Sequence, residues 1–289
     1  MDYLLLCIKI VCIIIFAPIV GGLLAGFDRK VSAKMQRRKG PPLLQPFYDV
    51  LKLLQKKSTT VSGSTIYFVT LSMVFSIFTV ILFMLGTDLL LCIFAFTLAV
   101  VFFVIAGYSS HSPYSFIGAE RELIQTMCYE PMVLIMAFGY YQAAGTFSIK
   151  GVFDLSSPII LKLPLIFIGV WYILTIKLRK SPFDLSMSHH GHQEIVKGIT
   201  TELTGVCMAM VEITHWFETV FALGLIYLFF AYDSMVSRVV AVFICLFVYF
   251  LEIIIDNTCA RVKWDMAIKT SWILIAVMGG VNLLVLSLF

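Results

Sequence analysis

Eight long apolar stretches constrain the fold of this chain more than any other feature. Each has about 20 residues or more, the length that a helix needs to cross roughly 30 Å of hydrocarbon. Backbone polar groups cannot stay unpaired in lipid, so we expect every stretch to be helical. The stretches cover residues 3–26, 66–86, 89–107, 123–145, 159–177, 203–231, 236–255 and 269–289. The sequence therefore predicts an all-α, polytopic protein with about eight transmembrane helices.

The composition excludes a soluble domain. The chain is 60% hydrophobic and 13% charged, against about 25% charged in an average soluble domain. We expect one integral membrane domain over residues 1–289, with the first stretch retained as a span rather than cleaved as a signal peptide. Pro18, Pro131 and Pro164 lie inside predicted spans and are expected to kink them.

Basic residues predict the orientation. If the connecting loops alternate between the two sides, one side receives 17 of the 21 lysines and arginines. The positive-inside rule puts that side in the cytoplasm, and hence both termini outside the cell membrane. Two cytoplasmic loops result, over residues 28–65 and 178–202. Within the first, residues 43–57 place Leu, Phe and Val at helical spacing, which predicts an amphipathic helix on the membrane surface.

Acidic residues and a histidine lie deep inside two of the apolar stretches. Glu212, His215 and Glu218 lie in one stretch at i, i+3 and i+6, so they share one side of its helix. Glu130 lies in another. An ionisable group at membrane depth costs about 2.5–3.5 kcal/mol on insertion scales, so such residues usually face a protein interior or a hydrated path. Two interpretations stay open: polar contacts that hold helices together, or a route for protons.

Other charged residues have plainer interpretations. Glu252 and Asp256, an i, i+4 pair at a predicted helix end, are expected to be solvated or paired with Arg261 or Lys263. Glu120, Arg121 and Glu122 are interpreted as a solvated helix start, where acids suit the helix dipole, with docking of a partner as the alternative.

Candidate metal ligands are few. The seven cysteines contain no CxxC pair, so we expect no iron–sulfur cluster and no structural zinc in this chain. His189, His190 and His192 are close enough in sequence to bind a metal through imidazole. No further ligand apart from Glu194 lies nearby, and a cytoplasmic docking loop is the preferred interpretation.

Three segments on the predicted cytoplasmic side are more specific. They read RKGPPLLQPFYDVLK from residue 38, GAERELIQTMCYEP from residue 118 and SPFDLSMSHHGHQEIVKGITTEL from residue 181. Together they resemble the membrane subunit shared by respiratory complex I, as its subunit 1, and membrane-bound nickel–iron hydrogenases, in particular the energy-converting ones. Gly40-Pro41-Pro42 leads almost directly into Leu43, whereas complex I members have a longer segment there. That difference favours the hydrogenase branch over the quinone-using one.

The resemblance implies roles for individual residues. Glu194 and Glu202 match acids of the channel that links the redox module to proton paths in quinone-using relatives. The family's next in-membrane glutamate has either Glu212 or His215 as its counterpart. The proton-transfer set expected here is Glu130, Glu194, Glu202, Glu212, His215 and Glu218. The docking or coupling set is Arg38, Gly40, Pro41, Gln45, Asp49, Glu120, Arg121, Glu122, Asp184, His189, His190 and His192.

By the same resemblance, this is a non-catalytic subunit of a ferredoxin-dependent hydrogenase complex. It would dock the hydrophilic nickel–iron module and couple proton reduction or H₂ oxidation to translocation of H⁺ or Na⁺. Expected partners are the hydrogenase large and small subunits, an iron–sulfur subunit and an antiporter-like membrane subunit, with all redox cofactors in those partners. Two alternatives stay open: a free-standing cation/proton antiporter, and the same subunit in a quinone- or sulfur-reducing relative.

Overall fold

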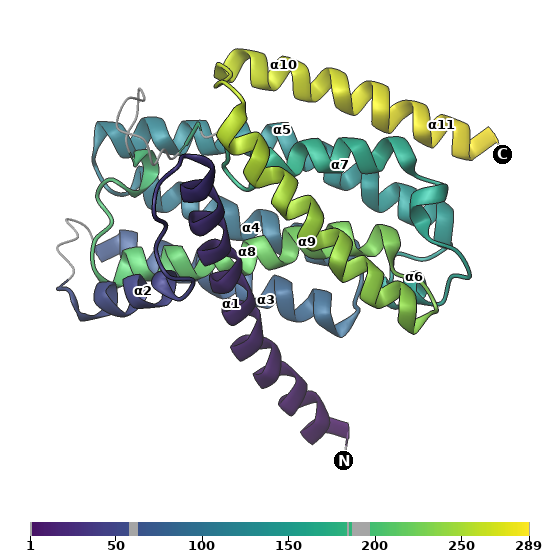
Figure 1. Cartoon of the computed structure of the whole chain (residues 1–289), viewed down its shortest axis with the longest axis horizontal. Coiled ribbons are helices and arrows are strands. Elements are labelled where there is room, and N and C mark those ends of the chain that lie inside the picture. Colours follow the sequence, from purple (N-terminus) through teal and green to yellow (C-terminus); the bar gives the residue numbers. More distant parts are fainter. Residues whose placement is uncertain (1, 58–62, 184, 187–196, 289) are drawn as a thin grey trace.

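The computed structural model describes residues 2–57, 63–183, 185–186 and 197–288 of the chain, and helices make up its architecture throughout. Figure 1 shows a bundle from which the N-terminal half of α1 projects. The first half of the chain forms α1 (Asp2–Met35), α2 (Gln45–Gln55), α3 (Gly63–Leu85), α4 (Leu89–Tyr108) and α5 (Pro113–Ala144). The second half forms α6 (Ile149–Phe153), α7 (Pro164–Lys177), α8 (Val206–Phe230), α9 (Met235–Thr258), α10 (Trp264–Leu274) and α11 (Val281–Leu288).

The all-α membrane fold is confirmed. Within the described ranges, six helical units are long and apolar enough to cross a membrane: α1, α3, α4, α8, α9 and the α10–α11 unit. A π-helical turn, Ile275–Gly280, makes α10 and α11 continuous. The predicted fourth span lies in α5, which has 32 residues, and the predicted fifth span lies in α7, which has 14.

Two predicted boundaries are wrong. Residues 28–35 belong to α1 rather than to a loop, because Arg, Lys, Ala and Met all favour helix and apolarity marks only the lipid-embedded part. Residues 159–161 form a separate 3₁₀ turn, and Pro164 begins α7 instead of kinking a longer helix. At 1.5 Å per residue, α7 is about 21 Å long, shorter than the hydrocarbon layer.

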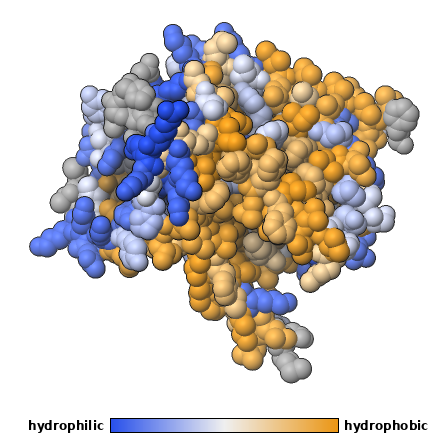
Figure 2. All heavy atoms as spheres, in the orientation of Figure 1, coloured by the Kyte–Doolittle hydropathy of each residue, from blue (hydrophilic) through white to orange (hydrophobic). Residues whose placement is uncertain are grey.

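Helix α8 holds the centre of the bundle. It packs against α1, α2, α3 and α9, and Phe217 and Phe229 are among the largest fully buried side chains. Lipid tails are as apolar as leucine, so tight fit rather than water exclusion holds such helices together. Figure 2 shows apolar atoms over the middle of the bundle and hydrophilic atoms gathered at the end near α2.

Close backbone approach joins α1 to the segment that leads into α2. A Cβ added at Gly26 would lie 2.0 Å from the carbonyl oxygen of Leu43, which is backbone and cannot move aside. On the next helix, Phe47 of α2 packs against Trp216 of α8 with ring centres 5.1 Å apart. The seam between α1, α2 and α8 is therefore closed by direct contact.

The start of α7 is supported from the far end of the chain. Its own N-cap residue, Leu163, offers no side-chain bond. The Asn282 Oδ1 atom of α11 instead accepts hydrogen bonds from the Leu165 and Ile166 amides at 3.0 and 3.1 Å, and Asn282 Nδ2 donates to the Lys162 carbonyl at 3.0 Å. Asn282 thus satisfies donors that a short helix would otherwise leave unpaired inside the bundle.

We expect Gly26→Ala to lower thermal stability in mild detergent, because the new methyl group must displace the Leu43 backbone. Overpacking of this kind costs about 1–3 kcal/mol. The matched control is Gly280→Ala, where no atom lies within 4 Å of the added Cβ. Equal melting temperatures for the two variants would show that the contact between α1 and Leu43 is not tight.

We expect Asn282→Ala to destabilise the chain by about 1–3 kcal/mol, because buried amides at the start of α7 lose their acceptor. Hydrogen exchange should accelerate at Leu165 and Ile166, measured by mass spectrometry of the purified protein. Ser287→Ala on the same helix removes an exposed hydroxyl that bonds only the Leu284 carbonyl, and it serves as the control. Unchanged exchange at α7 in Asn282→Ala would contradict the capping role.

Candidate functional site

A buried cluster of charges lies where α5, α7 and α8 meet. Arg179 follows α7 by two residues, and its guanidinium binds the Glu122 carboxylate of α5 through both oxygens: Nε–Oε1 is 3.2 Å, Nε–Oε2 is 3.1 Å and Nη2–Oε1 is 2.6 Å. The side chains are 10% and 3% exposed, respectively. Two-pronged pairing of this kind fixes both side chains in position.

The same guanidinium contacts α8. Arg179 Nη1 lies 2.8 Å from His215 Nδ1 and 3.5 Å from Glu218 Oε2. His215 Nδ1 is also 3.2 Å from Glu218 Oε2, and Lys177 Nζ is 3.5 Å from Glu218 Oε1. Glu218 of α8 therefore contacts both cations from the end of α7, and His215 contacts one of them, Arg179.

Charge balance explains why this cluster can be buried. Two carboxylates, Glu122 and Glu218, face two cations, Lys177 and Arg179. Each buried ion costs several kcal/mol of desolvation. That cost is offset only when the opposite charges pair with good geometry and the net charge of the cluster is zero. Arg179 also takes a positive φ of 50°, a backbone conformation that disfavours non-glycine residues. The backbone is thus held in a strained form that turns this side chain inward.

Arg179 is a fixed charge rather than a proton carrier. Burial works against its charged form, but the carboxylates of Glu122 and Glu218 outweigh burial and raise the pKa of Arg179 above its ordinary value. A guanidinium that never deprotonates can orient and balance other groups only electrostatically. Any proton that moves through the cluster must therefore be carried by the carboxylates, by His215 or by Lys177.

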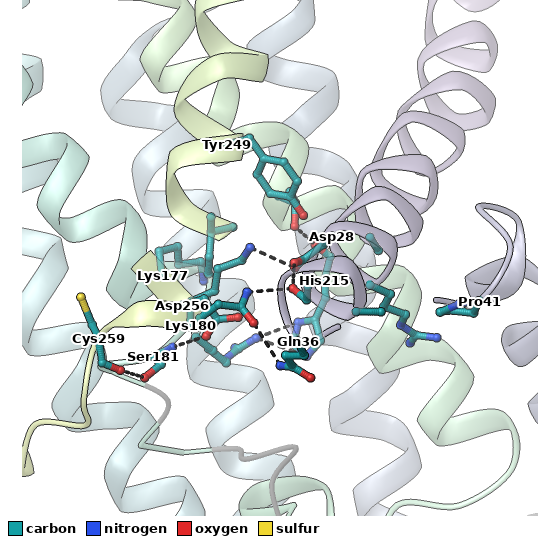
Figure 3. Close-up of a pocket in the computed structure, with 18 of the residues that line it drawn as sticks. Asp28, Gln36, Pro41, Lys177, Lys180, Ser181, His215, Tyr249, Asp256 and Cys259 are labelled. Atoms are coloured by element: carbon teal, nitrogen blue, oxygen red, sulfur yellow. Dashed lines mark hydrogen bonds and ion pairs between the residues drawn. The ribbon is translucent and has the colours of Figure 1, made fainter. Parts of the chain in front are cut away.

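A second polar group lies between α1 and α9 (Figure 3). Lys180 Nζ is 2.9 Å from Asp28 Oδ2 and 4.7 Å from the centre of the Tyr249 ring. The Asp256 carboxylate accepts a hydrogen bond from the Ser181 amide at 2.8 Å. Two successive residues after α7 thus point to different sides of the bundle. Arg179 contacts α5 and α8, whereas Lys180 contacts α1.

A cavity of about 940 Å³ lies between these two groups. Its walls come from α1, the segment after α1, the end of α7, α8 and the end of α9. The predicted trio of α8, Glu212, His215 and Glu218, lines it. Exposed Arg38 and Lys39 line its rim at the hydrophilic end of the molecule. The cavity can therefore bring water and charge from that end to buried groups of α8.

The other predicted proton-transfer residues lie elsewhere. Glu130 is half-buried on α5 and accepts a hydrogen bond from the Thr97 hydroxyl of α4 at 2.9 Å. Glu202 is half-buried in the turn before α8. Glu194 lies outside the described residues, as do Asp184, His189, His190 and His192 of the predicted docking set. Across the described ranges, no group of three His, Cys, Asp or Glu residues has metal-binding geometry.

Most described residues of the predicted docking set lie at the surface. Arg38, Gly40 and Glu120 are exposed, and Pro41, Gln45, Asp49 and Arg121 are half-buried. Asp49 pairs with Arg29 at 2.6 Å, which ties α2 to the end of α1. Burial would raise the pKa of Asp49, but hydrogen bonds from Arg29 and Gln45 outweigh it and lower that pKa.

Two sequence interpretations are wrong. Glu122 is not part of a solvated helix start, because α5 begins at Pro113 and places Glu122 in its third turn, against Arg179. Glu252 is not solvated at a helix end, because it is fully buried, with Trp171 and Lys180 as its neighbours. In both cases a neighbouring helix covers a position that looks terminal in sequence.

The sequence interpretation missed Lys177, Arg179 and Lys180 as site residues. They stand together after an apolar stretch, and such a run usually marks a solvated cytoplasmic loop. The available signal was the surplus of intramembrane acids on α5 and α8, which need cations of equal number inside the protein.

Comparisons with known proteins agree with this architecture. Residues 8–287 match the NADH dehydrogenase family. NADH-ubiquinone oxidoreductase chain 1 of Aedes aegypti is 27% identical over 94% of this chain and 92% of its own length. Formate hydrogenlyase subunit 4 of Escherichia coli is 27% identical over 90% of this chain and 92% of its own length.

Among solved structures, a chain of the membrane-bound sulfane sulfur reductase, an archaeal respiratory membrane complex, has a TM-score of 0.87. The alignment covers 97% of this chain and 99% of that one at 24% identity, so it shows a common fold. With its helical membrane architecture and a family match over nearly its whole length, the chain belongs to the NADH dehydrogenase family, the family of complex I subunit 1 and of homologous hydrogenase membrane subunits.

Proposed function

We propose that this chain is the membrane subunit that couples a hydrophilic redox module to ion translocation in an energy-converting hydrogenase complex. One observation carries the proposal: a cavity that begins at the hydrophilic end of the bundle and reaches Glu212, His215 and Glu218 on a membrane helix. The redox module would dock over the rim of this cavity. The chain itself would hold no redox centre and would carry protons or Na⁺.

The buried cluster supplies a physical mechanism for coupling. A unit charge that appears about 8 Å from a carboxylate changes its energy by about 2 kcal/mol at an effective dielectric constant of 20. That energy alters the proton occupancy of the carboxylate more than tenfold. Charge taken up by a docked partner at the rim would therefore change the protonation of His215 or Glu218, and the proton would be released when the charge leaves.

Several features favour the hydrogenase branch within the family. The short Gly40-Pro41-Pro42 segment brings Leu43 directly against Gly26, and Phe47 packs on Trp216. This packing places α1, α2 and α8 in direct contact in the region that helps to build the quinone entrance of quinone-using relatives. The E. coli relatives include Hydrogenase-4 component C, 26% identical over 87% of this chain. Ferredoxin would then be the electron donor to the complex.

The proposed partners follow from this branch. They are the hydrogenase large and small subunits, an iron–sulfur subunit and an antiporter-like membrane subunit, which would hold all nickel, iron and iron–sulfur centres. Docking would use the surface around Arg38, Gly40 and Glu120 at the hydrophilic end of the bundle. That end would face the cytoplasm of a cell membrane, with both termini outside.

The subunits that co-purify with the chain in mild detergent test to which branch of the family it belongs. A stoichiometric partner with two CxxC pairs for nickel and iron would support the hydrogenase proposal. Complexes that reduce quinone or sulfane sulfur, and not protons, would place the chain in a different branch. A chain that purifies alone and exchanges cations in liposomes would support the free-standing antiporter instead.

We expect Glu212→Gln to lower ion uptake per H₂ formed by about tenfold or more, because the amide cannot carry a proton. Hydrogen formation itself should continue, since no redox centre is touched. The measurement compares H₂ output with acidification or ²²Na⁺ uptake in proteoliposomes of the whole complex. Asp233→Asn removes one charge from an exposed carboxylate after the opposite end of α8 and serves as the control, and wild-type coupling in Glu212→Gln would remove Glu212 from the route.

A further inference from the structure

A second, smaller cavity lies behind Lys177. Its volume is about 30 Å³, and its walls are Phe96, Tyr129, Val133, Val170, Phe221 and neighbouring apolar residues of α7 and α8. Lys177 lines this inner cavity and also the large cavity. The lysine side chain thus separates the large polar cavity at the hydrophilic end from a small apolar cavity between α4, α5, α7 and α8.

Two buried polar groups at the inner cavity, Lys177 Nζ and the Tyr129 hydroxyl, have few partners among the described residues. Lys177 Nζ has only the 3.5 Å ion pair with Glu218 and lies 4.0 Å from the centre of the Phe96 ring. The Tyr129 hydroxyl is buried, and its side-chain partner is Thr126 of the same helix. The nearby Thr126 hydroxyl donates its hydrogen to the Glu122 carbonyl. Lys177 and Tyr129 therefore both line the same small space, and each can make further hydrogen bonds.

The inner cavity has room and partners for water. A water molecule needs about 10–15 Å³ of such volume and two to four polar partners, and apolar cavities without partners stay dry. The ammonium of Lys177 offers three donors, and the Tyr129 hydroxyl can donate or accept. A water in this cavity would accept from Lys177 and bond Tyr129, which adds hydrogen bonds to two buried polar groups.

We propose that Lys177 passes protons between the large cavity and a water molecule held in the inner cavity. This inference rests on the proposed coupling function and names the residue that connects its two compartments. In the step, an N–H bond of the ammonium breaks and its proton moves to the inner water, which gives up one of its own protons toward the Glu130 carboxylate. The neutral amine then takes a proton from Glu218, which has received it from protonated His215, and the ammonium is restored.

The groups that face Lys177 fit this step. Glu122 approaches from α5, Arg179 from the segment after α7, and Glu218 with His215 from α8, while α4 contributes the Phe96 ring. On the inner side, Tyr129 and Phe96 are the direct neighbours in sequence of Glu130 and Thr97, which are hydrogen-bonded to each other. The inner water therefore lies beside the seam of α4 and α5 that holds Glu130.

The substitution Lys177→Arg separates proton transfer from simple charge balance. Arginine keeps the positive charge beside Glu218 but does not deprotonate in proteins. In proteoliposomes of the intact complex, we expect Lys177→Arg and Lys177→Met to lower ion uptake per redox turnover by about tenfold or more. Lys162→Arg, at the opposite end of α7, is the matched control.

Wild-type coupling in Lys177→Arg would overturn the proposal, because charge alone would then suffice. If Lys177→Met fails to assemble, the arginine variant still gives the decisive result. Absence of ion uptake in the wild-type complex would instead refute the coupling function itself, together with this step.

A second measurement does not depend on activity. A high-resolution cryo-electron microscopy map of the wild-type complex should show water density within hydrogen-bond distance of Lys177 Nζ and the Tyr129 hydroxyl. Tyr129→Phe should weaken or remove that density and slow ion uptake severalfold, with redox turnover retained. An empty inner cavity in the wild-type map would overturn the proposal even if the complex translocates ions.

Discussion

The contact between Arg179 and Glu122 is the interaction on which the site depends. It joins α5 to the end of α7 and leaves one guanidinium nitrogen to hold His215 and Glu218 of α8. Without a fixed cation there, the Glu122 and Glu218 carboxylates of this cluster would have Lys177 alone to balance them. Buried charges of this kind persist only as a neutral set with good geometry. The site is therefore one electrostatic unit assembled from three helices.

The bilayer imposes a second constraint, and α7 shows its effect. A 14-residue helix cannot cross the hydrocarbon layer, so its first amides begin inside the bundle. Asn282, more than a hundred residues away, supplies the missing acceptor. The short helix also ends early enough for Lys177, Arg179 and Lys180 to turn inward. The short length of α7 thus places the charged residues that follow its C-terminal end inside the bundle.

The two cavities give this charge unit an outer and an inner side. The large cavity connects it to the hydrophilic end of the bundle, where a partner can change the local charge. Lys177 separates that space from the inner cavity beside Tyr129. Coupling in this chain would consist of proton transfer through the Lys177 side chain. A change of charge at the rim of the large cavity would drive that transfer. Large helix movements are not required for such a mechanism.

The sequence by itself determined the all-α membrane fold, the grouping of Glu212, His215 and Glu218, and the family. Apolar length, helical spacing and local motifs are properties of contiguous residues, so they can be read along the chain. Only the tertiary structure decided that Glu122, Lys177 and Arg179 are buried together. The partners of Arg179 lie 57 and 36 residues away on other helices, and no local pattern tells whether a basic residue at a helix end turns toward water or toward a distant carboxylate.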